Sequence, residues 1–247
     1  MHDVRLGAAE GRVSCGSWVS LGDTLSAEMM GRAGFDWLIL DGQHGGVNEG
    51  NMLQLLQAVE LGGTPGLVRV KWNDPAEIMR ALDLGAAGVV VPMVSTAEAA
   101  QTAAQAVRYP PLGIRSYGRV RNSYQAAAAN APEPLCLVMI ETREALDNLD
   151  AIAGTAGVDG LFIGPIDLAI SMGFGPSLEP PIEVMEALEA IAAACVRHGV
   201  ICGAATLGPD NAQAMRARGV TFLTLGSDVG FLRRGAAAEV ARAGEWR

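Results

Sequence analysis

Two carboxylates in the sequence stand directly after apolar runs. Glu141 follows CLVMI, and Asp167 follows GLFIGPI. If these runs are successive strands of a parallel sheet, the carboxylates lie at one edge of it, because neighbouring strands are about 4.8 Å apart. Carboxylate oxygens together with water are the ligands that Mg²⁺, Mn²⁺ and related divalent ions prefer. Each residue could instead cap the helix that follows it or pair with an arginine.

Other polar residues end apolar runs in the same way. Asp41, Gln43 and His44 follow WLIL, and Arg69 lies late in GLVRV. Beside Asp41, His44 could act as a general base, although a lone histidine is usually structural. Arg69 could supply a fixed cation or pair with a loop carboxylate. Taken with the two acids, these residues describe a site that stabilises an enolate.

Eight short runs rich in Val, Ile and Leu must position these residues, and a helical pattern follows each of them. The predicted strands are Ser14–Ser20, Trp37–Leu40, Gly66–Val70, Gly88–Val91, Cys136–Ile140, Gly160–Ile163, Val200–Ala204 and Phe222–Leu225. They are apolar throughout, as expected when both faces of a parallel sheet are covered. The pattern predicts one α/β domain over residues 1–247, a (β/α)₈ TIM barrel. An open doubly wound sheet is the alternative.

Local signals mark the helix ends and the long connections. Thr24 and Thr96 are predicted N-caps, and Asp74-Pro75 is predicted to start a helix. Several helices are expected to end at glycine. Those glycines are Gly34, Gly85, Gly199 and Gly219. The two long connections, which contain Gly113–Tyr124 and Ser171–Pro181, are interpreted as loops over the active end of the barrel.

Composition narrows the class of protein. The formal net charge is −9 without a basic stripe, which argues against nucleic-acid binding. No signal peptide or membrane span is expected, and the four cysteines form no C-x-x-C pair, so we expect a cytoplasmic enzyme. Lys71 is the only lysine. A Schiff-base mechanism, which we disfavour, would have to use it.

Six motifs resemble the HpcH/HpaI family of class II, metal-dependent pyruvate aldolases, which includes the 4-hydroxy-2-oxoheptanedioate aldolases. The motifs are AGFDWLILDGQH, VRVKWNDP, VVVPMV, RYPPLGIRS, MIETREALDNL and GVDGLFIGPIDLAISMG. The resemblance covers nearly the whole chain and implies a barrel of the phosphoenolpyruvate/pyruvate type. It also implies reversible cleavage of 4-hydroxy-2-oxo acids to pyruvate and an aldehyde through a pyruvate enolate.

The resemblance further implies a divalent metal ion, Mg²⁺, Mn²⁺ or Co²⁺, held by Glu141 and Asp167. The metal would bind pyruvate through its carboxylate and its C2 oxygen. The substrate carboxylate would lie on the segment Gly164, Pro165, Ile166 and Asp167, where backbone N–H groups begin a helix.

Catalytic roles also follow from the resemblance. Arg69 would stabilise the enolate oxygen. His44 would act in acid/base chemistry with a water of the metal, and Asp83 would orient it. Tyr117, Arg119 and Arg121 would lie near the aldehyde. Homo-hexamers whose partner chains help to build each site are expected.

One position departs from the commoner family pattern. This chain has Asp41-Gly42-Gln43-His44 where many members read D-G-E-H. Gln43 would remain near the substrate but remove one negative charge near the metal's water. Two alternatives stay open: a related enolate-forming lyase or decarboxylase, acting on oxaloacetate or an acyl-CoA, and a non-catalytic small-molecule binder on the same barrel.

Overall fold

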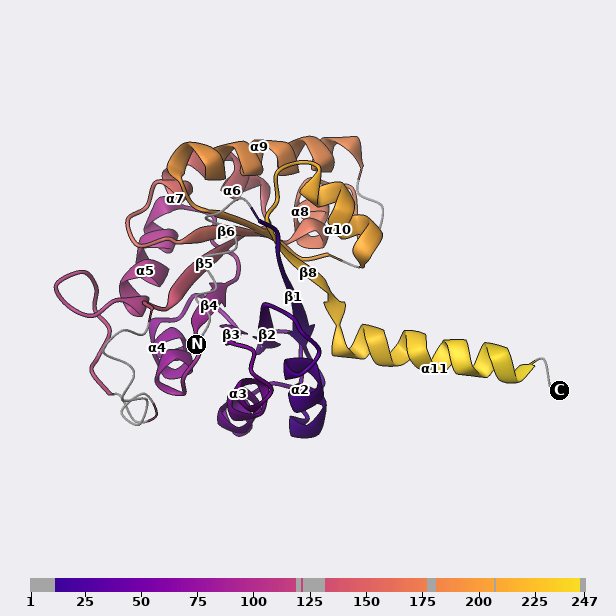
Figure 1. The fold of residues 1–247 in the computed structure, drawn as a ribbon. Helices are drawn as coiled ribbons and strands as arrows, with labels where there is room; N and C mark the ends of the chain where they lie inside the picture. Colours follow the sequence, from indigo (N-terminus) through magenta and orange to yellow (C-terminus); the bar gives the residue numbers. More distant parts are fainter. Residues whose placement is uncertain (1–11, 119–120, 122–131, 177–180, 207, 245–247) are drawn as a thin grey trace.

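Eight parallel strands form a closed barrel in chain order, and helices surround it (Figure 1). The computed structural model describes residues 12–118, 121, 132–176, 181–206 and 208–244. The strands are β1 (Ser14–Val19), β2 (Trp37–Asp41), β3 (Gly66–Arg69), β4 (Gly88–Val91), β5 (Leu135–Ile140), β6 (Gly160–Ile163), β7 (Ile201–Ala204) and β8 (Phe222–Ser227). The predicted (β/α)₈ barrel is confirmed, and the predicted strand ends agree to within two residues.

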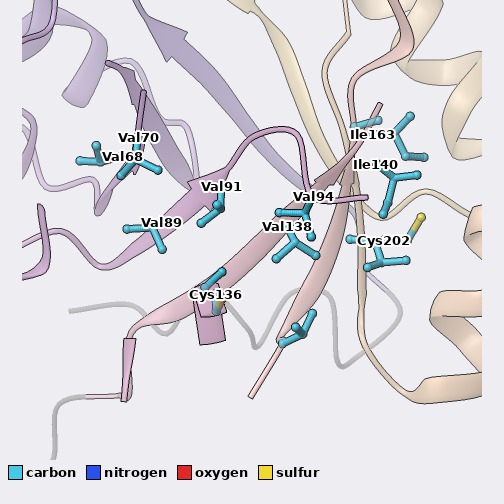
Figure 2. Packing of buried hydrophobic residues seen from close by; sticks show 14 of the residues in the cluster. Val68, Val70, Val89, Val91, Val94, Cys136, Val138, Ile140, Ile163 and Cys202 are labelled. Atoms are coloured by element: carbon cyan, nitrogen blue, oxygen red, sulfur yellow. The ribbon is translucent and has the colours of Figure 1, made fainter. Parts of the chain in front are cut away.

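The barrel has an apolar interior and a second apolar layer outside its wall. Inside, Trp37 stacks on Phe222 with 3.8 Å between ring centroids. Gly16 makes room for this pair, because a Cβ there would lie 2.2 Å from the Trp37 ring. Outside, valine and isoleucine side chains of the strands, such as Val89 and Val138, pack in the layer shown in Figure 2. Both faces of each strand are therefore buried, which explains why the sequence runs are apolar throughout.

The helices begin and end largely where local chemistry indicates. They are α2 (Thr24–Gly31), α3 (Met52–Leu61), α4 (Pro75–Asp83), α5 (Ala97–Val107), α6 (Arg143–Asp147), α7 (Leu149–Ala153), α8 (Pro165–Ser171), α9 (Ile182–His198), α10 (Pro209–Arg216) and α11 (Asp228–Gly244). Asp74 and Thr96 are N-caps, as predicted. The prediction for Thr24 is wrong: Asp23 caps α2 by accepting the Ser26 N–H at 2.9 Å.

The glycines predicted to end helices adopt left-handed backbone conformations. Gly34, Gly85, Gly199 and Gly219 have φ values of 92°, 100°, 67° and 92°. Side chains disfavour this region, so glycine is the residue expected at such helix exits.

The described part of the segment Gly113–Tyr124, residues 113–118 and 121, lies at the opposite end of the barrel from the one predicted. It follows α5, so the chain has already returned to the N-terminal ends of the strands. Ile114 donates to the Gln105 carbonyl at 2.9 Å, and Arg121 donates to the Leu84 carbonyl at 3.1 Å. For the described residues 113–118 and 121, the interpretation as a loop over the active end is wrong. Ser171–Pro181 follows α8 and lies partly outside the described residues.

Helix α11 extends away from the barrel instead of packing along it (Figure 1). Its residues from Leu232 onward are largely exposed, and Leu232 and Val240 are 63% and 68% exposed. Among the described helices, none is long and apolar enough to cross a membrane.

Candidate active site

Arg69 is held at the C-terminal end of β3 by a carboxylate from the neighbouring strand. The register of β2 and β3 places Asp41 directly opposite Arg69. The Asp41 carboxylate accepts from Nε at 2.9 Å and from Nη2 at 2.7 Å. Burial raises the pKa of Asp41, but the hydrogen bonds and charge of Arg69 outweigh it, so the net pKa lies below its usual value. Asp41 is therefore ionised and fixes the guanidinium in one orientation.

Trp18 supports the same guanidinium from β1. The Arg69 guanidinium carbon lies 4.4 Å from the centroid of the indole ring. Asp41 occupies the Nε–H and one Nη2–H, which leaves three of the five N–H donors of Arg69 for another ligand. Because Arg69 also lines a cavity of about 840 Å³ at this end of the barrel, these donors form a preorganised site for an anionic oxygen.

Glu141 follows β5 and is only 3% exposed. Its Oε1 accepts the backbone N–H of Met93 at 2.6 Å, and Met93 has the positive φ of 56° that places it in the left-handed region. Its Oε2 faces Gly164, where a Cβ would lie 2.6 Å away. Glycine is thus required at this position for Glu141 to reach the strand end. Among the described residues, Oε2 makes no hydrogen bond.

Asp167 lies beside Glu141 in the first turn of α8, which follows β6. Burial raises the pKa of Glu141, and the negative charge of Asp167 raises it further. A divalent cation between the two carboxylates would offset both effects. No group of three or more His, Cys, Asp or Glu that could hold a metal occurs in the described part of the chain. A pair of carboxylates is still compatible with an ion such as Mg²⁺, because Mg²⁺ commonly uses one or two carboxylates and keeps several waters.

A cavity of about 840 Å³ opens at this end of the barrel. Arg69, His44 and Asp167 line it, and Glu141 lies behind Gly164, which also lines it. The cavity-lining residues that sequence reasoning missed belong to the ends of strands, to the loops after them and to helix α11. They are Trp18, Ser20, Met139, Ala205, Thr206, Gly226, Gly230, Arg233, Arg234 and Ala237.

The segment from Gly164 to Asp167 gives the cavity a wall of backbone. Gly164, Pro165 and Ile166 all line it. Pro165 is the first residue of α8, so the N–H groups of Ile166 and Asp167 have no acceptor within the helix. These two donors lie beside the carboxylate pair, where an anionic group of a ligand would need them.

Other residues implied by the family resemblance do not line the cavity of the same chain. Asp83 ends α4 at the N-terminal side of the barrel and pairs with Arg115 at 2.8 Å. Tyr117 packs against Tyr109, and Arg121 pairs with Glu60. Arg119 lies outside the described residues. Gln43 donates its backbone N–H to Asp41. Within one chain, the structure shows no contact between His44 and Asp83 among the described residues.

The catalytic alternative that depends on Lys71 finds no support in this geometry. Lys71 is exposed and pairs with Glu77 at 3.0 Å. It does not line the 840 Å³ cavity. Lys71 instead lines a second cavity of about 310 Å³, which Arg69 also borders, whereas a Schiff base needs a lysine that reaches the ketone beside Glu141 and Asp167.

The model of the HpcH/HpaI aldolase/citrate lyase family matches residues 14–235. The chain belongs to this family. A hydroxypyruvate/pyruvate aldolase of Rhizorhabdus wittichii is 40% identical over 98% of this chain and 99% of its own. A 4-hydroxy-2-oxo-heptane-1,7-dioate aldolase of Klebsiella pneumoniae is 41% identical over 94% of this chain and 90% of its own. The structure of an HpcH/HpaI aldolase/citrate lyase family protein from Burkholderia cenocepacia superposes on this chain with a TM-score of 0.85. It is 30% identical, and the match covers 94% of this chain and 95% of that protein. The predictions of family, barrel and aldolase-type lyase are confirmed.

Proposed function

We propose that this family member is a metal-dependent aldolase that cleaves 4-hydroxy-2-oxo acids to pyruvate and an aldehyde, and that it also runs the reverse addition. The observation that carries the proposal is the meeting of three features at one barrel end. Glu141 and Asp167 form a carboxylate pair, and Arg69 presents free N–H donors beside them. An enolate intermediate needs a cationic surrounding of this kind.

Glu141 and Asp167 would hold the divalent ion, for which we propose Mg²⁺, Mn²⁺ or Co²⁺. When bound, the ion would supply Lewis acidity to the 2-oxo acid. The backbone N–H groups of Ile166 and Asp167 would receive the substrate carboxylate at the start of α8. Gly164 and Pro165 complete this wall, and Gln43 lies in the turn that precedes His44.

The cleavage step then uses the chain's own groups. A base at the His44 side of the cavity takes the proton of the C4 hydroxyl, and the C3–C4 bond breaks. The electron pair moves into the pyruvate enolate, whose negative oxygen is stabilised by the free N–H donors of Arg69. Because Asp41 and Trp18 already fix the guanidinium, little reorganisation is required as the charge develops.

The 2-oxo acid that adds to the aldehyde, here called the donor substrate, can be identified by comparing candidates directly. One relative is named for two such substrates. The Rhizorhabdus wittichii protein is a hydroxypyruvate/pyruvate aldolase. We therefore propose assays with both pyruvate and hydroxypyruvate as donors. Assays with oxaloacetate test the alternative that the protein is a decarboxylase. Decarboxylation of oxaloacetate passes through the same enolate.

Chelation should abolish the reaction. We expect treatment with EDTA to stop exchange of the pyruvate methyl protons with solvent, because enolate formation would lose its Lewis acid. Adding Mn²⁺, Mg²⁺ or Co²⁺ should restore the exchange, which can be followed by NMR in D₂O. A magnesium–EDTA complex at equal concentration is the control for nonspecific effects.

Three results would contradict the proposal. Exchange that is indifferent to the chelator would reject the metal requirement. Metal binding without exchange for any of the three donors would identify a non-catalytic binder. Exchange without aldehyde release or addition would favour an enolate-forming lyase of another type.

We also propose that the protein forms a homo-oligomer, a hexamer by family resemblance. The support in this chain is α11, which leaves the barrel and exposes the apolar stripe Leu232, Ala236 and Val240. Positions i, i+4 and i+8 share one helix face, and a lone projecting helix buries too little surface to be stable by itself. In such an assembly, Asp83, Tyr117 and Arg121 would serve the site of a neighbouring copy.

Charged side chains on the apolar stripe of α11 should dissociate the oligomer into smaller species. We expect Leu232→Glu with Val240→Glu to lower the mass measured by light scattering, because each glutamate would be buried without a partner. The matched control is Val196→Glu on α9, since Val196 is 79% exposed and lies on the barrel surface. An unchanged mass for the double variant would exclude α11 from the interface.

A further inference from the structure

One face of α11 borders the cavity. The lining residues from this helix are Gly230, Arg233, Arg234 and Ala237. Their spacing of i, i+3, i+4 and i+7 places them on a single helix face. The exposed apolar stripe that starts at Leu232 lies on a different face. The helix therefore presents two arginines, framed by two small residues, to the mouth of the cavity.

The position of Arg234 is set by its neighbours. Its guanidinium lies over the Phe231 ring, 5.1 Å from the centroid. A Cβ on Gly230 would lie 3.3 Å from Nη1, and one on Gly226 would lie 3.8 Å from Nη2. The side chain thus folds back toward the end of β8, and the two glycines leave the space that it occupies. Stacking on an aromatic face holds a guanidinium while leaving its N–H groups free.

These two cations differ from most of the other arginines that the structure describes. Arg69, Arg108 and Arg197 each pair with a carboxylate at 2.7 Å. In the described part of the chain, neither Arg233 nor Arg234 has a carboxylate partner. A protein of net charge −9 thus leaves two cations without a carboxylate partner on the wall of the 840 Å³ cavity. Their charge lies on α11, away from the strand ends that carry Glu141 and Arg69.

We infer that Arg234, assisted by Arg233, binds a negatively charged group at the far end of the acceptor aldehyde. The inference rests on the proposed aldolase function, which places the 2-oxo acid end of the substrate at Glu141, Asp167 and Arg69. The aldehyde portion then extends from the barrel end toward the cavity mouth, where α11 lies. A carboxylate or phosphate is the group that a guanidinium fork binds best.

Matched aldehydes test this specificity. We would compare 4-oxobutanoate with its neutral methyl ester, and glyceraldehyde 3-phosphate with glyceraldehyde, using pyruvate and the metal-loaded enzyme. For at least one pair, the charged member should have a kcat/KM higher by about tenfold to a hundredfold, the range expected for hydrogen bonds to a charged group. Arg234→Ala should remove most of this preference, and Arg234→Lys should keep part of it.

Two controls keep the outcomes distinct. Arg242→Ala removes an arginine from the same helix that pairs with Glu239 and lies outside the cavity lining, and it should keep the preference. Pyruvate proton exchange, which does not need the acceptor, should be equal in the wild type and in Arg242→Ala. Exchange with no charge preference in the wild type, or a preference that survives Arg234→Ala, overturns this inference alone. Absence of exchange in the wild type overturns the proposed function beneath it.

Discussion

Glu141→Gln should abolish aldol activity and stabilise the metal-free protein at neutral pH. Activity should fall by about a thousandfold or more, because Lewis-acid stabilisation is commonly worth several kcal/mol and each 1.4 kcal/mol is a factor of ten. Glutamine keeps the shape and can still accept the Met93 N–H, but it removes one of the two charges that we propose hold the ion. Isothermal titration with Mn²⁺ should show the lost binding directly.

The stability effect has the opposite sign because of the Glu141 pKa. Burial and the nearby Asp167 raise that pKa in the folded protein. A raised acid pKa means that the fold favours the protonated form, so ionisation destabilises the fold as pH rises through the folded pKa. Urea unfolding in EDTA should therefore show Glu141→Gln gaining stability over wild type at neutral pH, and losing that advantage at pH values below the usual range of glutamate.

Glu144→Gln is the matched control, because it is the same substitution at a glutamate three residues later. Glu144 lies on the exposed surface of α6. It should alter neither metal binding nor the pH dependence of stability. If Glu141→Gln bound Mn²⁺ as wild type does, Glu141 would not be a ligand. If it were less stable than wild type in EDTA at neutral pH, the carboxylate would have a structural partner there.

Much of the barrel is predictable because its signals are local. An apolar run with both faces buried is continuous in sequence, and helix exits such as Gly85 carry their own conformational requirement. The residues at strand ends follow from the same reasoning, since Asp41, Arg69 and Glu141 come directly after or at the end of such runs. The register that pairs Asp41 with Arg69 required the structure, because sequence spacing does not fix how two parallel strands align.

The wrong interpretation of Gly113–Tyr124 as an active-site loop also concerns an arrangement in space that the sequence does not fix. Gly113–Tyr124 is rich in arginine and follows a long helical pattern, so its length suggested an active-site loop. A loop that precedes its helix lies at the C-terminal ends of the strands, and a loop that follows its helix lies at their N-terminal ends. This loop follows α5. Trp18 was missed because an apolar strand does not reveal which of its residues point toward the cavity. Arg234 was missed because α11 reads as an ordinary surface helix.

Asp41→Asn should lower the stability of the fold by about 3–5 kcal/mol at neutral pH, the usual cost of breaking a buried ion pair. The substitution leaves the Arg69 guanidinium buried without its counter-charge. Asparagine can still accept the backbone N–H groups of Gln43 and His44, so the turn itself is preserved. Urea unfolding gives the loss, and pyruvate exchange should fall with it, because Arg69 is no longer held in one orientation.

The pH dependence separates this charge effect from a packing effect. The folded pKa of Asp41 lies below its usual value because Arg69 outweighs the burial that raises it. Its stabilising contribution is therefore complete above the ordinary aspartate pKa of about 3.9 and is lost as pH falls through the folded pKa. The difference between wild type and Asp41→Asn should shrink over that acidic range, whereas a packing defect would persist.

Two further variants identify the source of the loss. Asp150→Asn also removes a carboxylate from an arginine pair, but Asp150 and Arg197 are exposed, so the loss should be much smaller. Combining Asp41→Asn with Arg69→Met removes both charges and should recover most of the stability while leaving the enzyme inactive. Recovery of stability without exchange would show that the buried pair is retained for the chemistry of the enolate, since the fold tolerates its replacement. If the double variant were as unstable as Asp41→Asn, the unpaired guanidinium would not be the cause of the loss.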